Sequence, residues 1–174
     1  MTPEDRTRLP RTKLARTKTG GWARKSDIKH GESGRPLCRW CGAETPPRRR
    51  TFCSRACVHE WKLRTDPGYL REKVLERDGG VCAKCSADTV ALRRDMRRLD
   101  FSARRRFLKE WGLGEKSRKS LWDADHIVPV AEGGGQCDLA NMRTLCLKCH
   151  REATAALRAR LTRAGARGMR TATS

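Results

Sequence analysis

The residues of this chain best suited to chemistry lie between Asp125 and His150. Asp125 and His126 are adjacent, Asn141 follows beyond a glycine-rich loop, and His150 ends the stretch. A neutral imidazole can take a proton from water near pH 7, because its usual pKa is about 6.5. A carboxylate and an imidazole can together hold a divalent cation that offsets negative charge on a phosphate. This combination predicts metal-assisted hydrolysis of a phosphodiester.

The positions of these residues predict separate tasks. Successive side chains of a strand point to opposite faces, so one of Asp125 and His126 can hold a metal while the other moves a proton. The imidazole suits proton transfer, whereas Asp125 and His150 suit Mg²⁺, Mn²⁺ or a later transition metal. Asn141 cannot act as a base, but it can hydrogen-bond across the loop and hold His126 toward the phosphate. Asp123 either touches the metal or is a solvated neighbour, and we favour the second.

The elements that must position these residues follow from the surrounding sequence. Residues 127–130 are a β-rich run, in which a proline suggests an edge or the end of a strand. Residues 133–135 are glycines and predict a loop, after which residues 141–145 can return as the partner strand. The Ala, Leu and Arg content of residues 152–163 favours a helix, which glycines should end near Ala164. The predicted order is strand, loop, strand, helix.

Eight of the nine cysteines fall into two sets of four with the spacing of zinc ligands. The predicted structural zinc sites are Cys38, Cys41, Cys53 and Cys57, and Cys82, Cys85, Cys146 and Cys149. The second set is widely separated in the chain, so its zinc binding energy would become folding energy. His59 competes as a ligand for the first set, although four thiolates are the simpler site. Cys137 is left over and is interpreted as a spare thiol.

The charge of the chain favours a polyanionic partner, most simply DNA. The 174 residues include 40 basic and 20 acidic side chains, for a formal net charge of +20. Charge alone also suits a ribosomal, membrane-surface or solubility role. The predicted hydrolytic site makes nucleic acid the preferred interpretation.

The composition also bounds the fold and the compartment. Hydrophobic residues make up 37% of the chain and aromatic residues 5%, so no single large core is expected and metal staples are needed. Paired cysteines without an apolar leader favour metal binding in a reducing, intracellular compartment: cytoplasm or nucleoid, or the nucleus of a eukaryote. No apolar stretch is long enough to predict a membrane span.

The domain organisation follows from composition and motif spacing. Residues 1–34 are predicted to be a disordered basic arm and residues 35–64 a four-cysteine zinc finger. Residues 65–164 form the predicted catalytic domain, in which residues 88–120 are an insertion. Residues 165–174 are a predicted tail.

Three arginine-rich segments are candidates for DNA contacts. One lies on the loop of the finger, and two lie on predicted basic helices of the insertion, for which Asp88 and Ser102 are candidate N-caps. The alternative is that these helices form a solvated hairpin and the finger only stabilises the fold. The candidate contacts are Arg48, Arg49, Arg50, Arg93, Arg94, Arg97, Arg104 and Arg105.

The Asp-His pair, the later Asn and the final His, framed by two Cys-x2-Cys pairs, resemble the HNH endonucleases with a ββα-metal (treble-clef) fold. The segment from Val74 to Cys85 also resembles the lead-in of that family, and the likeness covers residues 70–163. The resemblance implies a small α+β, zinc-stabilised fold. It further implies that His126 is the general base, that Asp125 and His150 bind the catalytic metal, and that Asn141 orients the loop.

Within the family, the chain resembles in particular the HNH domains at the C-terminal end of vertebrate annealing helicases. Residues 50–54, 133–137 and 144–146 carry this likeness. It implies a structure-specific endonuclease acting on branched DNA. The chain has no Gly-x4-Gly-Lys-Ser/Thr phosphate loop, so any ATP dependence or fork targeting would come from a helicase or another partner.

The resulting hypothesis is a metal-dependent DNA endonuclease that cuts one strand per active site and leaves 5′-phosphate and 3′-hydroxyl ends. Two alternatives remain open. One is a non-catalytic zinc-finger DNA-binding or adaptor protein, and the other is an HNH nuclease of the restriction or homing type. DNA specificity, the physiological metal and the oligomeric state are not determined by the sequence.

Overall fold

The computed structural model describes residues 25–113, 120–135 and 138–171. The chain divides into two compact units, Met1–Asp66 and Pro67–Ser174, each of which is described by itself. Among the described residues, none of the helices combines the length and apolar character that crossing a membrane requires. Residues 1–24 of the predicted arm, residues 114–119 of the predicted insertion, and Cys137 lie outside the described part of the chain.

Within residues 25–66, the described part of the first unit, the chain forms one α-helix and several tight turns. Helix α1 (Arg55–Thr65) begins after Ser54, whose hydroxyl accepts a hydrogen bond from the backbone N–H of Cys57 at 3.1 Å. This N-cap supplies a partner that the first turn of a helix otherwise lacks. Before α1 the chain runs through isolated bridges between Leu37 and Glu44 and between His30 and Pro36.

The prediction of a disordered arm is wrong for residues 25–34. Lys25–Asp27 form a short 3-10 helix (η2), and the backbone N–H of Gly31 donates to Arg35 O at 2.8 Å. Glu44 accepts hydrogen bonds from both the backbone N–H and the hydroxyl of Ser33. The composition of residues 25–34 suggested disorder because composition does not reveal hydrogen bonds to later residues such as Arg35 and Glu44.

In the second unit, helix α2 (Pro67–Asp78) begins at a proline and ends before two glycines. Pro67 occupies the first helical position, where its missing N–H costs nothing. The helix ends before Gly79 and Gly80, whose φ angles of 62° and 78° lie in the left-handed region that glycine adopts readily.

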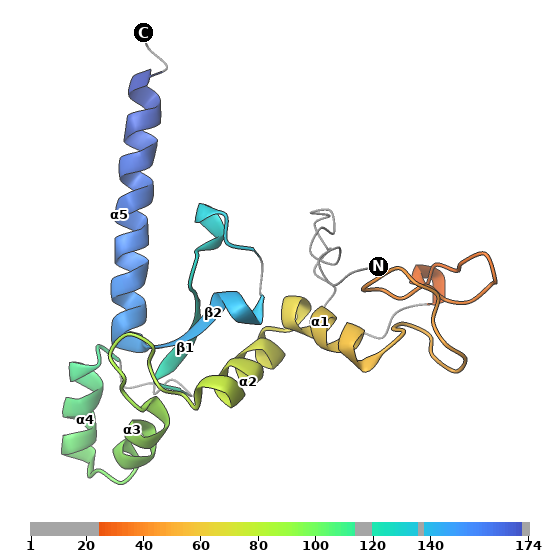
Figure 1. Ribbon diagram of the computed structural model, residues 1–174. Helices are drawn as coiled ribbons and strands as arrows, with labels where there is room; N and C mark the ends of the chain where they lie inside the picture. Colours follow the sequence, from red (N-terminus) through yellow and green to blue (C-terminus); the bar gives the residue numbers. More distant parts are fainter. Residues whose placement is uncertain (1–24, 114–119, 136–137, 172–174) are drawn as a thin grey trace. The chain divides into compact units, whose positions relative to one another are not determined.

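Strands β1 (Trp122–His126) and β2 (Met142–Cys146) form an antiparallel hairpin that leads into helix α5 (Leu147–Thr171). His126 is opposite Met142, and Asp125 is opposite Arg143. Helices α2 and α5 both pack against the hairpin (Figure 1). The small α+β fold and the strand–loop–strand–helix order are therefore confirmed.

The position of the first strand was predicted wrongly. Residues 127–130, the β-rich run, lie outside β1. The strand ends at His126 and consists of the five residues that precede the run. Val128 donates and accepts hydrogen bonds with the side chain of Asn141, and Pro129 has no N–H to donate. These two residues replace a strand ladder with a loop that contains the 3-10 helix Val130–Glu132 (η3).

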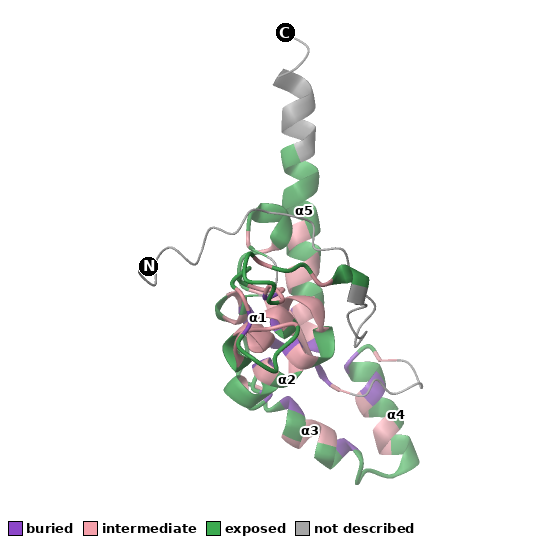
Figure 2. Ribbon diagram, turned by 90° about the vertical axis from the view of Figure 1, so that its right-hand side faces the viewer, coloured by how far each residue is buried: buried purple, intermediate pink, exposed green. Residues whose placement is uncertain are grey.

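The end of α5 also differs from prediction. The helix continues through Gly165 and Gly168 to Thr171, so these glycines do not end it. Glycine costs about 1 kcal/mol relative to alanine inside a helix, a cost smaller than that of proline, so a glycine alone need not end one. Figure 2 shows that exposed residues predominate on α5 beyond its contact with the hairpin.

The insertion contains two short helices, α3 (Thr89–Met96) and α4 (Phe101–Glu110). Asp88 is the N-cap of α3, as predicted, and accepts from two backbone N–H groups at 3.0 and 2.9 Å. The N-cap of α4 is Asp100 and not Ser102, because the Asp100 carboxylate accepts from the backbone N–H of Ala103 at 2.9 Å. An ionised carboxylate is also favoured at the positive end of a helix.

The core of the second unit is built around cysteines. Apolar residues from the insertion, β2, α5 and the position just before β1 surround three buried cysteine side chains, and buried residues are purple in Figure 2. The cluster consists of Cys82, Trp111, Leu121, Leu145, Cys146, Leu147 and Cys149.

Two charged residues at the end of α2, Arg77 and Asp78, form hydrogen bonds with β2 and the segment before it. The Arg77 guanidinium donates to the carbonyls of Leu139 and Met142 at 2.6 and 2.7 Å, on either side of Asn141. The Asp78 carboxylate accepts from the backbone N–H and hydroxyl of Thr144 at 3.0 and 2.9 Å. The hydrogen bond from Arg77, with those from Thr144, lowers the pKa of Asp78 despite its partial burial.

We expect Asp78→Asn to lower the free energy of unfolding by about 1–3 kcal/mol at pH 7, because two neutral donors lose a charged acceptor. A lowered folded pKa means that this contribution is complete above the unfolded pKa of about 3.9 and is lost as pH falls through the folded value. Urea unfolding from pH 7 down to the lowest pH at which both proteins retain zinc measures the difference. Asp95→Asn, whose side chain is 60% exposed, is the control. An equal loss of unfolding free energy in both variants would contradict a stabilising role for the hydrogen bonds between Thr144 and Asp78.

Candidate functional site

His126 ends β1 at the point where the chain turns into the loop. Its Nε2 atom is buried and has no hydrogen-bond partner among the described residues. A neutral imidazole has one donor and one acceptor nitrogen. With the proton on the buried Nε2, Nδ1 keeps the lone pair that can accept a proton.

Asn141 clamps the loop that follows His126. Its side-chain oxygen accepts from the Val128 N–H at 2.8 Å, and its amide nitrogen donates to the Val128 carbonyl at 3.0 Å. Its own carbonyl accepts from the Ile127 N–H at 2.8 Å. Asn141 closes the 3-10 helix Leu139–Asn141 (η4), which is capped by Asp138. Three hydrogen bonds thus fix the two residues after His126.

Two glycines let this loop close. Gly133 has a φ angle of 91°, a left-handed conformation that other residues adopt at a cost. At Gly134 a Cβ atom would overlap the Val128 carbonyl and lie 3.0 Å from the Asn141 amide nitrogen. Any larger residue at Gly134 would therefore displace the segment that Asn141 holds.

His150, in the first turns of α5, lies between two carboxylates of β1. Its Nε2 is 3.8 Å from Asp125 Oδ1, and its Nδ1 is 3.7 Å from Asp123 Oδ2. All three side chains are partly buried, with exposures of 33% for His150, 19% for Asp125 and 25% for Asp123. Alternation along β1 places Asp123 and Asp125 on the same face, which explains how one imidazole approaches both.

Two arginines hold these carboxylates. Arg143, opposite Asp125 in the hairpin, donates to Asp125 Oδ2 at 3.1 and 2.9 Å and leaves Oδ1 toward His150. Arg71 of α2 donates to Asp123 Oδ1 at 2.9 Å and to the Trp122 carbonyl at 3.1 Å. The interpretation of Asp123 as a solvated neighbour is wrong, because the fold places Arg71 beside it.

The donor set at Asp125 and His150 fits a divalent cation. Two ligands that are each about 2.1 Å from one ion lie no more than about 4.2 Å apart, and the 3.8 Å separation meets this limit. A carboxylate oxygen and an imidazole nitrogen suit Mn²⁺ or a later transition metal, and Mg²⁺ usually binds with one or two carboxylates, several waters and substrate phosphate.

The second cysteine set converges in space. Sulfur atoms of Cys82, Cys85, Cys146 and Cys149 lie within 4.8 Å of one another, and Cys85 Sγ is 3.7 Å from Cys146 Sγ. Tetrahedral zinc with Zn–S bonds of about 2.3 Å requires sulfur atoms about 3.8 Å apart. This cluster can therefore hold zinc, and it joins residues on both sides of the insertion.

The ionisation of this cluster also suits a cation. Burial opposes ionisation of Cys82, but hydrogen bonds from the backbone of Cys146, Cys85 and Lys84 outweigh it and lower the pKa to about 6. Burial and the neighbouring thiols raise the pKa of Cys149. Four adjacent thiolates repel one another, and a zinc ion removes that penalty.

The first cysteine set forms a similar cluster within its own unit. Cys41 Sγ is 3.5 Å from Cys53 Sγ, which is 3.4 Å from Cys57 Sγ, and Cys38 completes the group. His59 is not a member of the cluster. This set can hold a second zinc ion.

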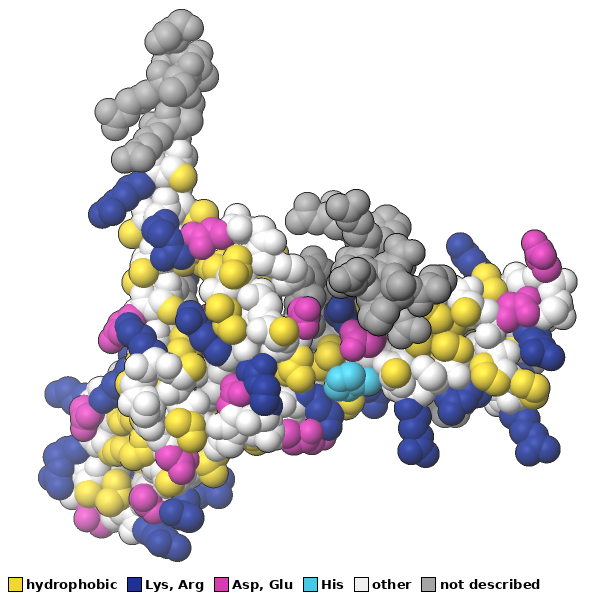
Figure 3. All heavy atoms as spheres, viewed as in Figure 1, with side chains coloured by type: hydrophobic (Ala, Val, Ile, Leu, Met, Phe, Trp, Pro, Cys, Tyr) yellow, Lys and Arg dark blue, Asp and Glu magenta, His cyan; other side chains and the backbone are white. Residues whose placement is uncertain are grey.

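The predicted DNA contacts are exposed or partly exposed, but their binding role remains a prediction. Arg48, Arg49 and Arg50 are exposed on the finger loop, where Arg48 has a φ angle of 66°. In Figure 3, Lys and Arg side chains stand out along the edge formed by α3 and α4, interleaved with hydrophobic and acidic ones. The structure contains no nucleic acid.

Sequence reasoning missed Arg71, Arg77 and Arg143, and it undervalued Asp123. Arg143 had one usable signal, because antiparallel pairing of the two strands brings it opposite Asp125. Arg71 and Arg77 lie on a helix distant in sequence from the carboxylates and carbonyls they bind, so no local pattern identified them.

Comparisons with known proteins identify the family of this chain. The family model described as HNH endonuclease matches residues 113–156. The crystallised HNH domain of human ZRANB3 is 34% identical and is covered over 97% of its length, which corresponds to 57% of this chain; the TM-score is 0.43. The chain belongs to the HNH endonuclease family. The stretch matched by the HNH model contains Asp125, His126, Asn141 and His150.

The chain also aligns with one part of much longer proteins. The protein named DNA annealing helicase and endonuclease ZRANB3 is 38% identical over 145 residues in Mus musculus and 36% identical over 143 residues in Homo sapiens. The mouse alignment covers 71% of this HNH chain but only 14% of the relative. The chain thus spans about one seventh of the length of the curated relatives it matches.

Proposed function

We propose that this HNH protein is a metal-dependent endonuclease that hydrolyses phosphodiester bonds of DNA. The observation that supports the proposal most strongly is the arrangement of His126 beside a loop clamped by Asn141, at the end of the strand whose Asp125 approaches His150 to 3.8 Å. The net charge of +20 favours binding to DNA.

The residues divide the work as follows. His126 takes a proton from water through Nδ1, and Asn141 keeps the following segment in place so that the imidazole faces the phosphate. Asp125 and His150 would hold Mg²⁺ or Mn²⁺. When bound, that cation supplies positive charge to stabilise the phosphate and the leaving oxygen. The products would carry 5′-phosphate and 3′-hydroxyl ends, and each site would cut one strand.

Asp123 is proposed as a positioning residue. Its Oδ2 faces His150 Nδ1, while Arg71 holds Oδ1. A carboxylate beside the far nitrogen of a metal-binding imidazole fixes the ring and its tautomer, so that Nε2 keeps its lone pair for the metal. Arg143 would in the same way fix the orientation of Asp125.

We expect Asp123→Asn to weaken Mn²⁺ binding by about 10-fold, the lower end of the range for such partners, and to lower kcat comparably. Electron paramagnetic resonance of Mn²⁺ added to the zinc-loaded protein measures the affinity directly. Asp95→Asn is the matched control, because its side chain lies 60% exposed on α3. Unchanged Mn²⁺ affinity in Asp123→Asn would remove the positioning role.

The proposal also covers the structural metal ions, the type of DNA, a targeting partner, the cellular location and the domain boundaries. Two structural zinc ions would occupy the two cysteine clusters. Resemblance to the annealing-helicase relatives supports a preference for branched DNA and a helicase or other targeting partner, as well as an intracellular location. The proposed domain division keeps the finger at residues 35–64 and the nuclease at residues 65–164.

The test is nicking of supercoiled plasmid by the purified full chain, with and without added Mg²⁺ or Mn²⁺. We expect relaxed circles only when the divalent cation is present. The ends can be identified by ligation, since 5′-phosphate and 3′-hydroxyl nicks are sealed directly. Tight, salt-sensitive binding without any nicking would instead support a DNA-binding adaptor.

A further inference from the structure

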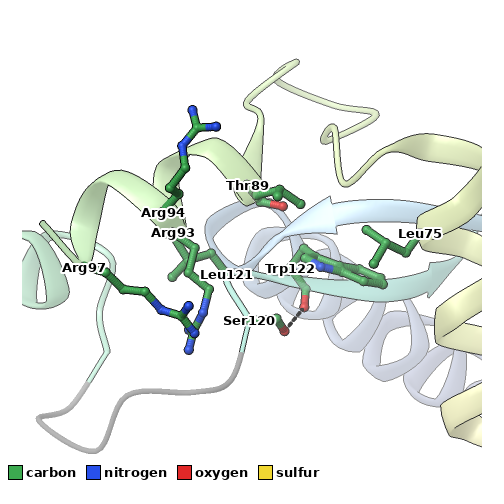
Figure 4. Close-up of a pocket in the computed structure, with 9 residues that line it drawn as sticks. Leu75, Thr89, Arg93, Arg94, Arg97, Ser120, Leu121 and Trp122 are labelled. Atoms are coloured by element: carbon green, nitrogen blue, oxygen red, sulfur yellow. Dashed lines mark hydrogen bonds between the residues drawn. The ribbon is translucent and has the colours of Figure 1, made fainter.

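A hollow of about 400 Å³ lies against the start of β1, between α2 and α3 (Figure 4). Leu75, Val90, Leu121 and Trp122 line it, so its surface is predominantly apolar. Leu75 and Val90 are 37% and 49% exposed, which keeps apolar surface open to solvent. The volume is within the range of small-ligand sites.

Arginines stand at the edge of this hollow. Arg93 lies on α3 and Arg97, four residues later, is the C-cap of that helix; in Figure 4 their side chains extend to the same side, whereas that of Arg94 extends to the other. Burial, followed by the charges of Arg97 and Arg104, lowers the pKa of Arg93. Like charges this close repel one another, so an anion bound between them would be stabilised.

The hollow is separate from the candidate metal ligands. Side chains alternate along β1, so Trp122 lies on the opposite face from Asp123 and Asp125. Trp122 is also at the far end of the strand from His126, about 13 Å away at 3.3 Å per residue. A ligand in the hollow would thus leave the hydrolytic site open.

The apolar lining and the arginines of the hollow indicate the kind of ligand that it can bind. An apolar floor beside two guanidinium groups suits a flat, weakly polar body that carries a phosphate, which describes a nucleotide. A base inside a duplex keeps its faces against its neighbours and cannot reach such a floor. We propose that the hollow binds an unpaired nucleotide of the DNA substrate, with its base over Val90 and Leu75 and its phosphate on Arg93 and Arg97.

This inference rests on the proposed function, because it takes DNA as the substrate. It gives the insertion a task that the hydrolytic residues do not perform: holding a single-stranded part of the DNA while another part is cut. The apolar floor distinguishes it from general attraction of DNA to a basic surface, which requires no contact with bases.

The experiment measures fluorescence anisotropy of labelled oligothymidylate, about eight nucleotides long. The same-length abasic oligomer and a duplex are compared, all with the full chain carrying His126→Ala so that nothing is cut. We expect the abasic oligomer to bind about tenfold more weakly than oligothymidylate. Val90→Asp should remove that difference, and an acidic residue is tolerated in the first turn of α3. Arg97→Ala should weaken oligothymidylate about tenfold.

Arg98→Ala is the matched control, because Arg98 is the next residue and does not line the hollow. Equal binding of abasic and normal oligomers would overturn the proposal. So would equal losses in Arg97→Ala and Arg98→Ala, or a loss in Val90→Asp that is the same for duplex. Plasmid nicking by the unmodified chain is read separately, so failure of nucleotide binding and failure of nuclease activity are distinguishable.

Discussion

Replacing His126 with Ala is expected to slow DNA cleavage by about 100- to 10,000-fold, the range that general acid–base catalysis contributes. The variant loses the imidazole proposed as the general base, while Asp125 and His150 remain 3.8 Å apart with Arg143 on Asp125. DNA affinity should change little, because the candidate DNA contacts are arginines that the substitution leaves in place. Nicking rates and anisotropy with the same plasmid and oligonucleotides measure the two effects separately.

The design includes a positive control for the base. Added imidazole should restore part of the activity of His126→Ala, because a small base can enter the space left by the side chain. His30→Ala, which removes an exposed imidazole of the first unit, should cut at the normal rate. Full activity in His126→Ala would remove this residue from the proposed mechanism, whatever the metal dependence.

Replacing Cys82 with Ser is expected to unfold the second unit. Cys82 is 1% exposed and belongs to the buried cluster that contains Cys146 and Cys149. Structural zinc contributes about 10–16 kcal/mol in zinc-finger peptides, comparable to the total stability of about 5–15 kcal/mol of a domain. Loss of one thiolate therefore removes enough binding energy to unfold a core built around the metal. Amide hydrogen exchange and zinc content report the change.

Cys38→Ser is the matched variant in the other cluster. It should reduce the zinc content from two ions to one and leave exchange protection in β1, β2 and α5 intact. Plasmid nicking then shows whether the finger contributes to DNA binding. Equal loss of protection in both variants would show that the two units fold as one cooperative structure and would contradict their independence.

The arrangement at His150 suggests how metal binding and the surrounding fold are connected. Its two ring nitrogens face Asp125 and Asp123, and each carboxylate is held by an arginine from another element. Arg71 comes from α2 and Arg143 from β2, so folding of α2 onto the hairpin orders one side of the site. The proposed metal site is thus assembled by the same contacts that stabilise the unit.

The residue types and spacings by themselves predicted the chemistry proposed for this protein. Asp125, His126, Asn141 and His150 are separated by short segments, and the cysteine pairs have ligand spacing that few other structures use. The α+β class followed as well, because the hairpin and its helix are contiguous in the chain. The N-cap of α3 at Asp88 was also predicted correctly, since a capping side chain acts on the backbone only two and three residues away.

Only the tertiary structure decided what surrounds those residues. Arg71 reaches Asp123 and Arg77 reaches the carbonyls beside Asn141 across more than fifty residues of chain, and no sequence period encodes such contacts. The same is true of the limits of β1, where the Asn141 side chain competes for the Val128 backbone and ends the ladder. Local propensity describes a segment in isolation, whereas hydrogen-bond partners and burial depend on which distant segments the core brings together.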